Sequence, residues 1–192
     1  MATEIELKYN ATPAVLAAME AAISQPGIPY RMETTYYDTP TRALAARNIT
    51  LRRRMENELS VCTLKAPAKE GRLEFELHRD SIEDAIPELC KLASIPQLPA
   101  LLEQGVEPVC GARFDRVAKT VTYAGATIEI ALDRGILTGG GREQPLCEVE
   151  FELKTGSVRD LQAYATVLAV KYGLQPEKRS KFARAMALAK GE

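Results

Sequence analysis

Charged and apolar residues alternate with a period of two in several segments of the chain, which is the period of side chains along a β-strand. The alternation begins with Glu4-Ile5-Glu6-Leu7-Lys8 and returns in Cys147-Glu148-Val149-Glu150-Phe151-Glu152-Leu153-Lys154. Similar patterns or a β-rich composition mark residues 31–38, 49–55, 59–65, 71–79, 109–123 and 126–133. The chain is therefore predicted to form about eight antiparallel strands, each with one apolar and one charged face.

Apolar residues at helical spacing predict helices after Thr12-Pro13, within residues 81–102, and after the N-cap residues Ser157 and Ser180. These helices need an apolar surface to pack on, and only the apolar strand faces provide one. The charged faces then point the other way and line a lumen if the sheet closes. The predicted fold class is α+β, with an eight-stranded antiparallel β-barrel, a charged lumen and helices packed outside.

The charged strand faces are sorted by sign. Glu148, Glu150 and Glu152 share one face, where like charges repel each other, and Arg52 and Arg54 share another. In one strand alone, a solvated outer face would explain such alternation. Its repetition with sorted charges favours a cavity in which bound ligands neutralise the charged walls, because burying so many unpaired charges is costly.

Composition sets broad limits on what the chain can be. The 192 residues are 46% hydrophobic and 27% charged, which is typical of one globular domain, and no composition break divides residues 1–192. The net charge of −1 lacks the basic excess of many nucleic-acid binders, so no nucleic-acid partner is expected. No apolar run approaches the ~20 residues of a membrane span, and no signal peptide is evident, which predicts a cytoplasmic protein without a membrane partner.

The inventory of metal-binding side chains favours oxygen ligands. Cys62, Cys90, Cys110 and Cys147 are widely separated, and His78 is the single histidine, so zinc and redox sites are not expected. A metal would lie among carboxylates, which points to Mg²⁺ or Mn²⁺. His78 is expected at an exposed strand end. The glycines at 139–141 are expected at a hairpin tip, because no strand-loop-helix context surrounds them.

Eight sequence blocks carry a family resemblance, in this order: Glu4–Lys8, Tyr36–Thr39, Leu51–Arg54, Thr63–Lys65, Arg72–Glu76, Glu129–Gly135, Cys147–Lys154 and Ser180–Arg184. Together they resemble the CYTH superfamily of triphosphate tunnel metalloenzymes, and in particular its bacterial inorganic triphosphatase branch. The resemblance covers essentially the whole chain. It implies a barrel whose lumen binds a triphosphate and a divalent metal, Mg²⁺ or Mn²⁺.

The resemblance also implies roles for individual residues. The metal ligands are expected among Glu4, Glu6, Glu148, Glu150 and Glu152, with the choice among the last three left open. The phosphate-binding residues are expected to be Lys8, Arg52, Arg54, Lys65, Arg113, Arg116 and Lys181. The stretch Arg113-Phe114-Asp115-Arg116 breaks the alternation of charge, so one of its two arginines could face outward. Lys119 is a third candidate on this strand, after these two arginines. Glu4, Glu6, Lys8 and Glu150 are expected to be catalytic. Glu74, Glu76, Glu129 and Asp133 are expected to orient the basic side chains or to hold metal-bound water.

The predicted activity is metal-dependent hydrolysis of inorganic triphosphate to diphosphate and phosphate. Two alternatives are enzymatic: a class IV adenylate cyclase, and a thiamine or nucleoside triphosphatase. A third is a non-catalytic module that binds polyphosphate, which the carboxylates disfavour because they would repel it in the absence of metal. The partner is therefore a small molecule that contains a triphosphate. The sequence leaves open the oligomeric state and whether the chain is a fragment of a longer protein.

Overall fold

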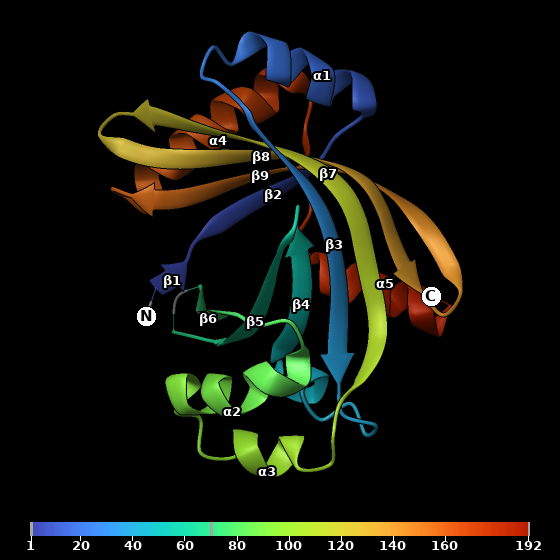
Figure 1. Ribbon diagram of the computed structural model, residues 1–192. Coiled ribbons are helices and arrows are strands. Elements are labelled where there is room, and N and C mark those ends of the chain that lie inside the picture. The colour runs from blue at the N-terminus through green and yellow to red at the C-terminus, as the bar shows by residue number, and fades with distance from the viewer. Residues whose placement is uncertain (1, 70, 192) are drawn as a thin grey trace.

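The computed structural model describes residues 2–69 and 71–191. A strongly curved antiparallel sheet forms the centre, and helices cover it in three places (Figure 1). The strands are β1 (Ala2–Glu4), β2 (Glu6–Asn10), β3 (Ile28–Asp38), β4 (Thr50–Glu56), β5 (Leu59–Pro67), β6 (Arg72–His78), β7 (Glu107–Tyr123), β8 (Ala126–Gly139), β9 (Arg142–Thr155) and β10 (Gln175–Pro176). The helices are α1 (Pro13–Ala22), α2 (Ile82–Ala93), α3 (Leu98–Leu102), α4 (Val158–Tyr172) and α5 (Lys181–Lys190), with a 3₁₀ turn η1 (Ala45–Arg47).

Across residues 2–69 and 71–191 the sheet contains ten strands in the order β1-β6-β5-β4-β3-β7-β8-β9-β2-β10, where eight were predicted. The N-terminal strand is split at Ile5, and β10 is a short addition at the edge. Residues 2–4 pair with β6, whereas residues 6–10 pair with β9. The hydrogen-bonded order of the described strands runs from β1 to β10 without closing, so the structure has a strongly curved open sheet in place of the predicted eight-stranded barrel. One short N-terminal segment nevertheless contacts both sides of the sheet.

The helix starts follow the predicted capping residues. The Thr12 hydroxyl accepts a hydrogen bond from the backbone N–H of Val15 at 3.3 Å, and Pro13 occupies the first turn of α1. Ser157 and Ser180 cap α4 and α5 in the same way, each at 3.1 Å. These bonds satisfy backbone donors that would otherwise lack a partner. None of the helices in the described residues is both long enough and apolar enough to cross a membrane.

The apolar strand faces lie outside, as predicted. Ile128, Ile130 and Phe151 are fully buried beneath α1 and α4, and a second core places β4, β5 and β6 against α2 and α3. Figure 1 shows these two helix pairs at opposite ends of the molecule. Because the helices cover the apolar faces, the charged faces of the strands turn toward the interior.

Helix α5 contradicts the prediction that all helices pack outside. Its residue Ala185 packs with Leu137 of β8 and Leu146 of β9, which lie on the same strand faces as the charged residues Asp133 and Glu148. Figure 1 shows α5 beneath the arch of β7, β8 and β9, on the other side from α1 and α4. A short helix with apolar and basic residues thus closes part of the inner face.

The glycines at the β8–β9 turn let this helix approach. They form a hairpin tip, as predicted, with φ of +57° at Gly140 and +73° at Gly141. A Cβ atom on Gly139 would lie 2.3 Å from the carbonyl oxygen of Ala185 in α5. Only glycine therefore permits this contact, and the hairpin fixes α5 against the sheet.

Candidate functional site

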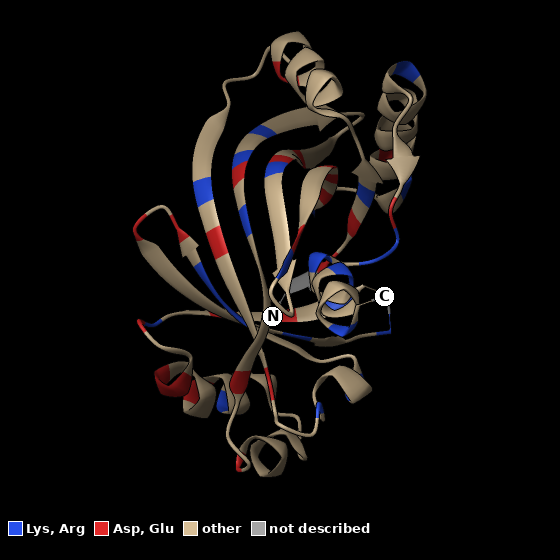
Figure 2. Cartoon of the chain, turned by 90° about the vertical axis from the view of Figure 1, so that its right-hand side faces the viewer, with Lys and Arg blue, Asp and Glu red and all other residues tan. Residues whose placement is uncertain are grey.

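The inner face of the sheet and the first turn of α5 enclose a cavity of about 600 Å³, which we call the central cavity. Figure 2 shows Lys and Arg side by side with Asp and Glu on the curved strands. Most of the predicted site residues line this cavity: Glu4, Glu6, Lys8, Arg52, Arg54, Lys65, Glu74, Glu76, Arg116, Glu129, Glu150, Glu152 and Lys181. Residues distant in sequence are thus brought together.

Three glutamates form a row across neighbouring strands, which we call the acidic row. Glu6 lies opposite Glu152, and Glu152 lies opposite Glu129. Lys154 lies 2.9 Å from Glu152 and 3.5 Å from Glu129, and Lys8 lies 2.7 Å from Glu6. Burial, reinforced by the nearby charges of Glu4 and Glu129, raises the pKa of Glu152. The row offers only carboxylate oxygens, which are the ligands that Mg²⁺ and Mn²⁺ prefer.

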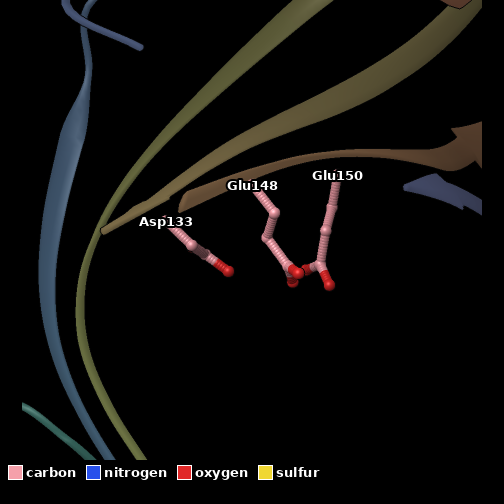
Figure 3. A group of neighbouring side chains, drawn as sticks. All are labelled: Asp133, Glu148 and Glu150. Carbon is pink, nitrogen blue, oxygen red and sulfur yellow. The ribbon is translucent and has the colours of Figure 1, made fainter. Parts of the chain in front are cut away.

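A second acidic group lies deeper, where oxygens of Asp133, Glu148 and Glu150 fall within 4.8 Å of one another (Figure 3). Lysine and arginine side chains neutralise the carboxylates of this group. The Lys181 ammonium lies 2.7 Å from Asp133 and 2.9 Å from Glu150, and it also contacts Glu148, which Arg184 contacts in turn. Asp133 and Glu148 are fully buried, so these ion pairs are shielded from solvent.

Arg116 completes this group. Its guanidinium donates two hydrogen bonds of 2.7 Å to Asp133 and one of 2.6 Å to Glu150. Despite burial, Lys181 and Arg116 hold the pKa of Glu150 well below its ordinary value, whereas burial keeps the pKa of Glu148 raised. We call these six residues the buried ion cluster: Asp133, Glu148, Glu150, Arg116, Lys181 and Arg184. Its three carboxylates face three cations, so a metal ion there would have to displace them.

The opposite wall carries basic side chains with fewer counterions. Arg54 is 6% exposed, and its Nε donates to the Thr34 hydroxyl at 2.9 Å. In the part of the chain that the structure describes, its one carboxylate partner is Glu56, 3.7 Å away. Burial and repulsion from Arg52 and Arg116 lower the pKa of Arg54 to about 10. The nearby Nε of Arg52 is buried and has no hydrogen-bond partner among the described residues. This wall is therefore suited to receive an anion.

Lys65 and Arg52 are held by glutamates of the adjoining strands. The Lys65 ammonium lies 2.6 Å from Glu4 and 3.1 Å from Glu74, and Arg52 lies 3.5 Å from Glu74 and 3.8 Å from Glu76. Lys65, Arg52, Glu74 and Glu76 all line the central cavity.

The structure places Arg113 outside the central cavity. Its side chain is 58% exposed and pairs with Glu143 at 2.9 Å. Alternation along β7 continues through Phe114 and Arg116, which face inward, so Arg113 must face outward. The Lys119 ammonium does not line the central cavity either, because it donates hydrogen bonds to two backbone carbonyl oxygens at the end of α1. The predicted phosphate contact of Arg113 does not fit this placement.

Glu148 is separated from the other predicted metal ligands. It lies opposite Asn10, four residues along β9 from Glu152, which corresponds to about 13 Å at the rise of a β-strand. It does not line the central cavity. Glu6 and Glu152 are cross-strand neighbours, whereas Glu148 lies with α5. The five predicted ligands therefore do not form one compact site. His78 is exposed, as expected.

Two residues of the site escaped the sequence analysis. Arg184 follows Lys181 by three positions, a spacing that places both on one face of α5. Phe114 lies on the inner face of β7 in strict alternation with Arg116. The alternation along β7 is a signal that identifies Phe114, but an apolar residue is not expected among the charged residues of the inner face.

Comparisons with known proteins concern the family and the fold of the chain. The family model of the CYTH domain matches residues 2–186. An inorganic triphosphatase from Haemophilus influenzae is 30% identical over 197 residues, which cover 98% of this chain and 55% of that protein. The chain thus spans about half the length of this curated relative.

Two solved structures have a similar fold. The first is a protein from Hippeastrum, named as a candidate adenylyl cyclase and described with a dominant triphosphatase activity. Its TM-score is 0.67 at 19% identity, covering 98% of this chain and 96% of that one. The second is a candidate adenylate cyclase from Bacillus halodurans, with a TM-score of 0.65 at 15% identity, covering 93% of this chain and 94% of that one.

Proposed function

Because the chain belongs to the CYTH family, we propose that it hydrolyses the terminal phosphoanhydride bond of inorganic triphosphate with the help of a divalent metal. The observation that carries this proposal is the central cavity, which has the acidic row on one wall and the weakly compensated Arg54 on another. Phosphoryl transfer needs both a cation that neutralises charge and donors that hold the phosphate oxygens. The inorganic triphosphatase of Haemophilus influenzae supports the choice of substrate.

We assign the metal to Glu6, Glu129 and Glu152, with Glu4 near Glu152. The fit rests on the donor set, which consists of carboxylates whose mutual repulsion a divalent cation would relieve. A bound Mg²⁺ or Mn²⁺ would supply charge neutralisation and an acidified water. The buried ion cluster fits this role less well, because its own cations already neutralise it.

The protein's own residues bind and orient the substrate. Lys8, Arg52, Arg54 and Lys65 hold phosphate oxygens by charge-assisted hydrogen bonds. Arg116 and Lys181 approach from the buried ion cluster, whose carboxylates fix their positions. Since these donors are set before substrate arrives, they stabilise the charge that develops on the transferred group without reorganising.

A second candidate substrate is an organic triphosphate, such as a nucleoside or thiamine triphosphate. Tyr30, Met32, Tyr36 and Phe182 line part of the central cavity and offer an apolar surface for an organic group. This surface also suits the cyclase alternative, which converts a nucleoside triphosphate. A binding module without catalysis is disfavoured, because the acidic row would repel polyphosphate in the absence of metal.

Inorganic triphosphate, thiamine triphosphate and ATP should be compared as substrates with Mg²⁺ and with Mn²⁺. We expect phosphate release to be fastest with inorganic triphosphate, to cease on addition of a chelator and to return when metal is restored. Release of phosphate and of cyclic nucleotide would be measured separately. Full activity in metal-free buffer would refute the proposal, and formation of cyclic AMP from ATP would favour the cyclase.

Replacing Arg54 by methionine should lower kcat/KM for triphosphate by about 10- to 100-fold, because it removes a charged hydrogen-bond donor from the phosphate. The contact exists in the ground state and strengthens as charge develops in the transition state, so KM should rise and kcat should fall. Arg113→Met is the matched control, since that arginine faces solvent on the neighbouring wall. Equal effects of the two substitutions would contradict the assignment.

A further inference from the structure

Three cations from three separate elements surround the ring of Phe114. The distances from the ring centroid are 5.0 Å to the Lys181 ammonium, 5.6 Å to the Arg54 guanidinium and 5.7 Å to the Arg116 guanidinium. These side chains come from α5, β4 and β7. All three distances lie within the range of cation–π attraction. Phe114 thus contacts Arg54 of β4 together with two cations of the buried ion cluster.

The three cations differ in their carboxylate partners. Arg116 and Lys181 each contact at least two carboxylates at 2.9 Å or less, whereas the single carboxylate that pairs with Arg54 among the described residues is 3.7 Å away. Yet Arg54 is as deeply buried as Lys181. Its positive charge therefore needs another source of stabilisation, and the negative face of the aromatic ring supplies one.

An aromatic ring has an advantage over a carboxylate at this position. A carboxylate would neutralise Arg54 and would also repel an incoming phosphate. The ring attracts the cations through its quadrupole but carries no net charge, so it leaves their affinity for an anion intact. The three cations can therefore lie close together and still bind an anion strongly.

The surrounding backbone fixes the ring in place. Phe114 is 4% exposed and lies between Met32 on β3 and Gly135 on β8. A Cβ atom on residue 135 would lie 2.5 Å from the Cα of Phe114 and 2.6 Å from its Cβ. Glycine at 135 therefore makes room for Phe114, and the close packing leaves the ring little freedom to move.

We propose that Phe114 is a positioning residue that holds Arg54, Arg116 and Lys181 together as one phosphate-binding group through cation–π contacts. This inference rests on the proposed function, because it assumes that the group binds the triphosphate. Phe114 itself does not touch the substrate in this arrangement.

The test is to replace Phe114 with mono-, di- and trifluorophenylalanine, introduced site-specifically in the full chain. Fluorine withdraws charge from the ring face with little change in shape. We expect KM for inorganic triphosphate to rise stepwise with each fluorine, to about tenfold for the trifluoro variant, with kcat changed less than about twofold. The dissociation constant of triphosphate in metal-free buffer, measured by calorimetry, should rise in parallel. Phe75, buried in the core under α2, is the matched control position.

The outcomes separate this inference from the proposed function. An unchanged KM and dissociation constant across the series, with an active parent protein, would overturn the role of Phe114. A parent that binds triphosphate without hydrolysing it would refute the activity, while a stepwise loss of binding would still support Phe114. A parent that neither binds nor hydrolyses triphosphate would overturn both. A melting temperature equal to that of the parent shows that each variant is folded.

Discussion

Glutamine in place of Glu6 should lower kcat for triphosphate hydrolysis by at least roughly 100-fold under saturating Mg²⁺, while metal-free binding of triphosphate changes little. The substitution keeps the shape of the side chain but removes one charge from the acidic row, at the position opposite Glu152. The basic wall on β4 and β5 is untouched, so the substrate is still held. Steady-state kinetics and calorimetry measure the two quantities separately.

The control for this substitution is Glu143→Gln. Glu143 is 58% exposed and pairs with Arg113 outside the central cavity, so its charge is remote from the proposed chemistry. We expect its kinetics to match those of the parent protein. Hydrolysis by the Glu6 variant at the parent rate would show that the acidic row is not where the metal acts.

Methionine in place of Lys181 should lower the free energy of unfolding at pH 7 by about 3–5 kcal/mol, because it leaves buried carboxylates with less positive charge than they need. Lys181 is 5% exposed and contacts Asp133, Glu148 and Glu150. Activity should fall as well, since the same ammonium is proposed to bind phosphate. Urea unfolding followed by circular dichroism gives the stability.

The loss of stability should depend on pH in a defined direction. In the parent, the lowered pKa of Glu150 stabilises the fold above the range where an unfolded glutamate titrates, and this contribution is lost as pH falls. Without Lys181, the buried carboxyl groups should have raised pKa values, so the folded variant binds more protons than the unfolded chain. Its stability relative to the parent should therefore improve from pH 7 to pH 5.

Lys190→Met is the matched control on the same helix, because Lys190 is exposed in the last turn of α5. It should change the free energy of unfolding by less than about 0.5 kcal/mol. A difference between the Lys181 variant and the parent that does not shrink at lower pH would contradict the charge balance assigned to the buried ion cluster.

The strands were predictable because a period of two is a local property of the sequence. The charged faces of β2, β4 and β9 could be assigned from alternation alone, and their inward direction followed from the need of α1 and α4 for an apolar surface. The placement of Arg113 does not follow from the charged residues alone, because Arg113 and Arg116 lie on opposite faces of a regular strand. Strict alternation along β7 with Phe114 on the inner face predicts that Arg113 faces outward.

Other features depend on contacts between residues that are far apart in the sequence, and a local pattern does not reveal such contacts. Alternation places Glu148, Glu150 and Glu152 on one face, but only the pairing of β9 with β2 shows that Glu152 lies beside Glu6 and Glu148 beside Asn10. The inward position of α5 likewise depends on the close contact between Gly139 and Ala185. A sequence reading can therefore identify the residues of this site more readily than their division into an acidic row and a buried ion cluster.

The split N-terminal strand has a consequence for how the protein folds. Residues 6–10 pair with β9, which lies far from them in the sequence, and Glu6 meets Glu152 only through this pairing. Such a pairing between distant parts of the chain raises the contact order and slows folding. We expect the protein to gain its metal affinity only once β2 has paired with β9, because this pairing brings Glu6 and Glu152 together.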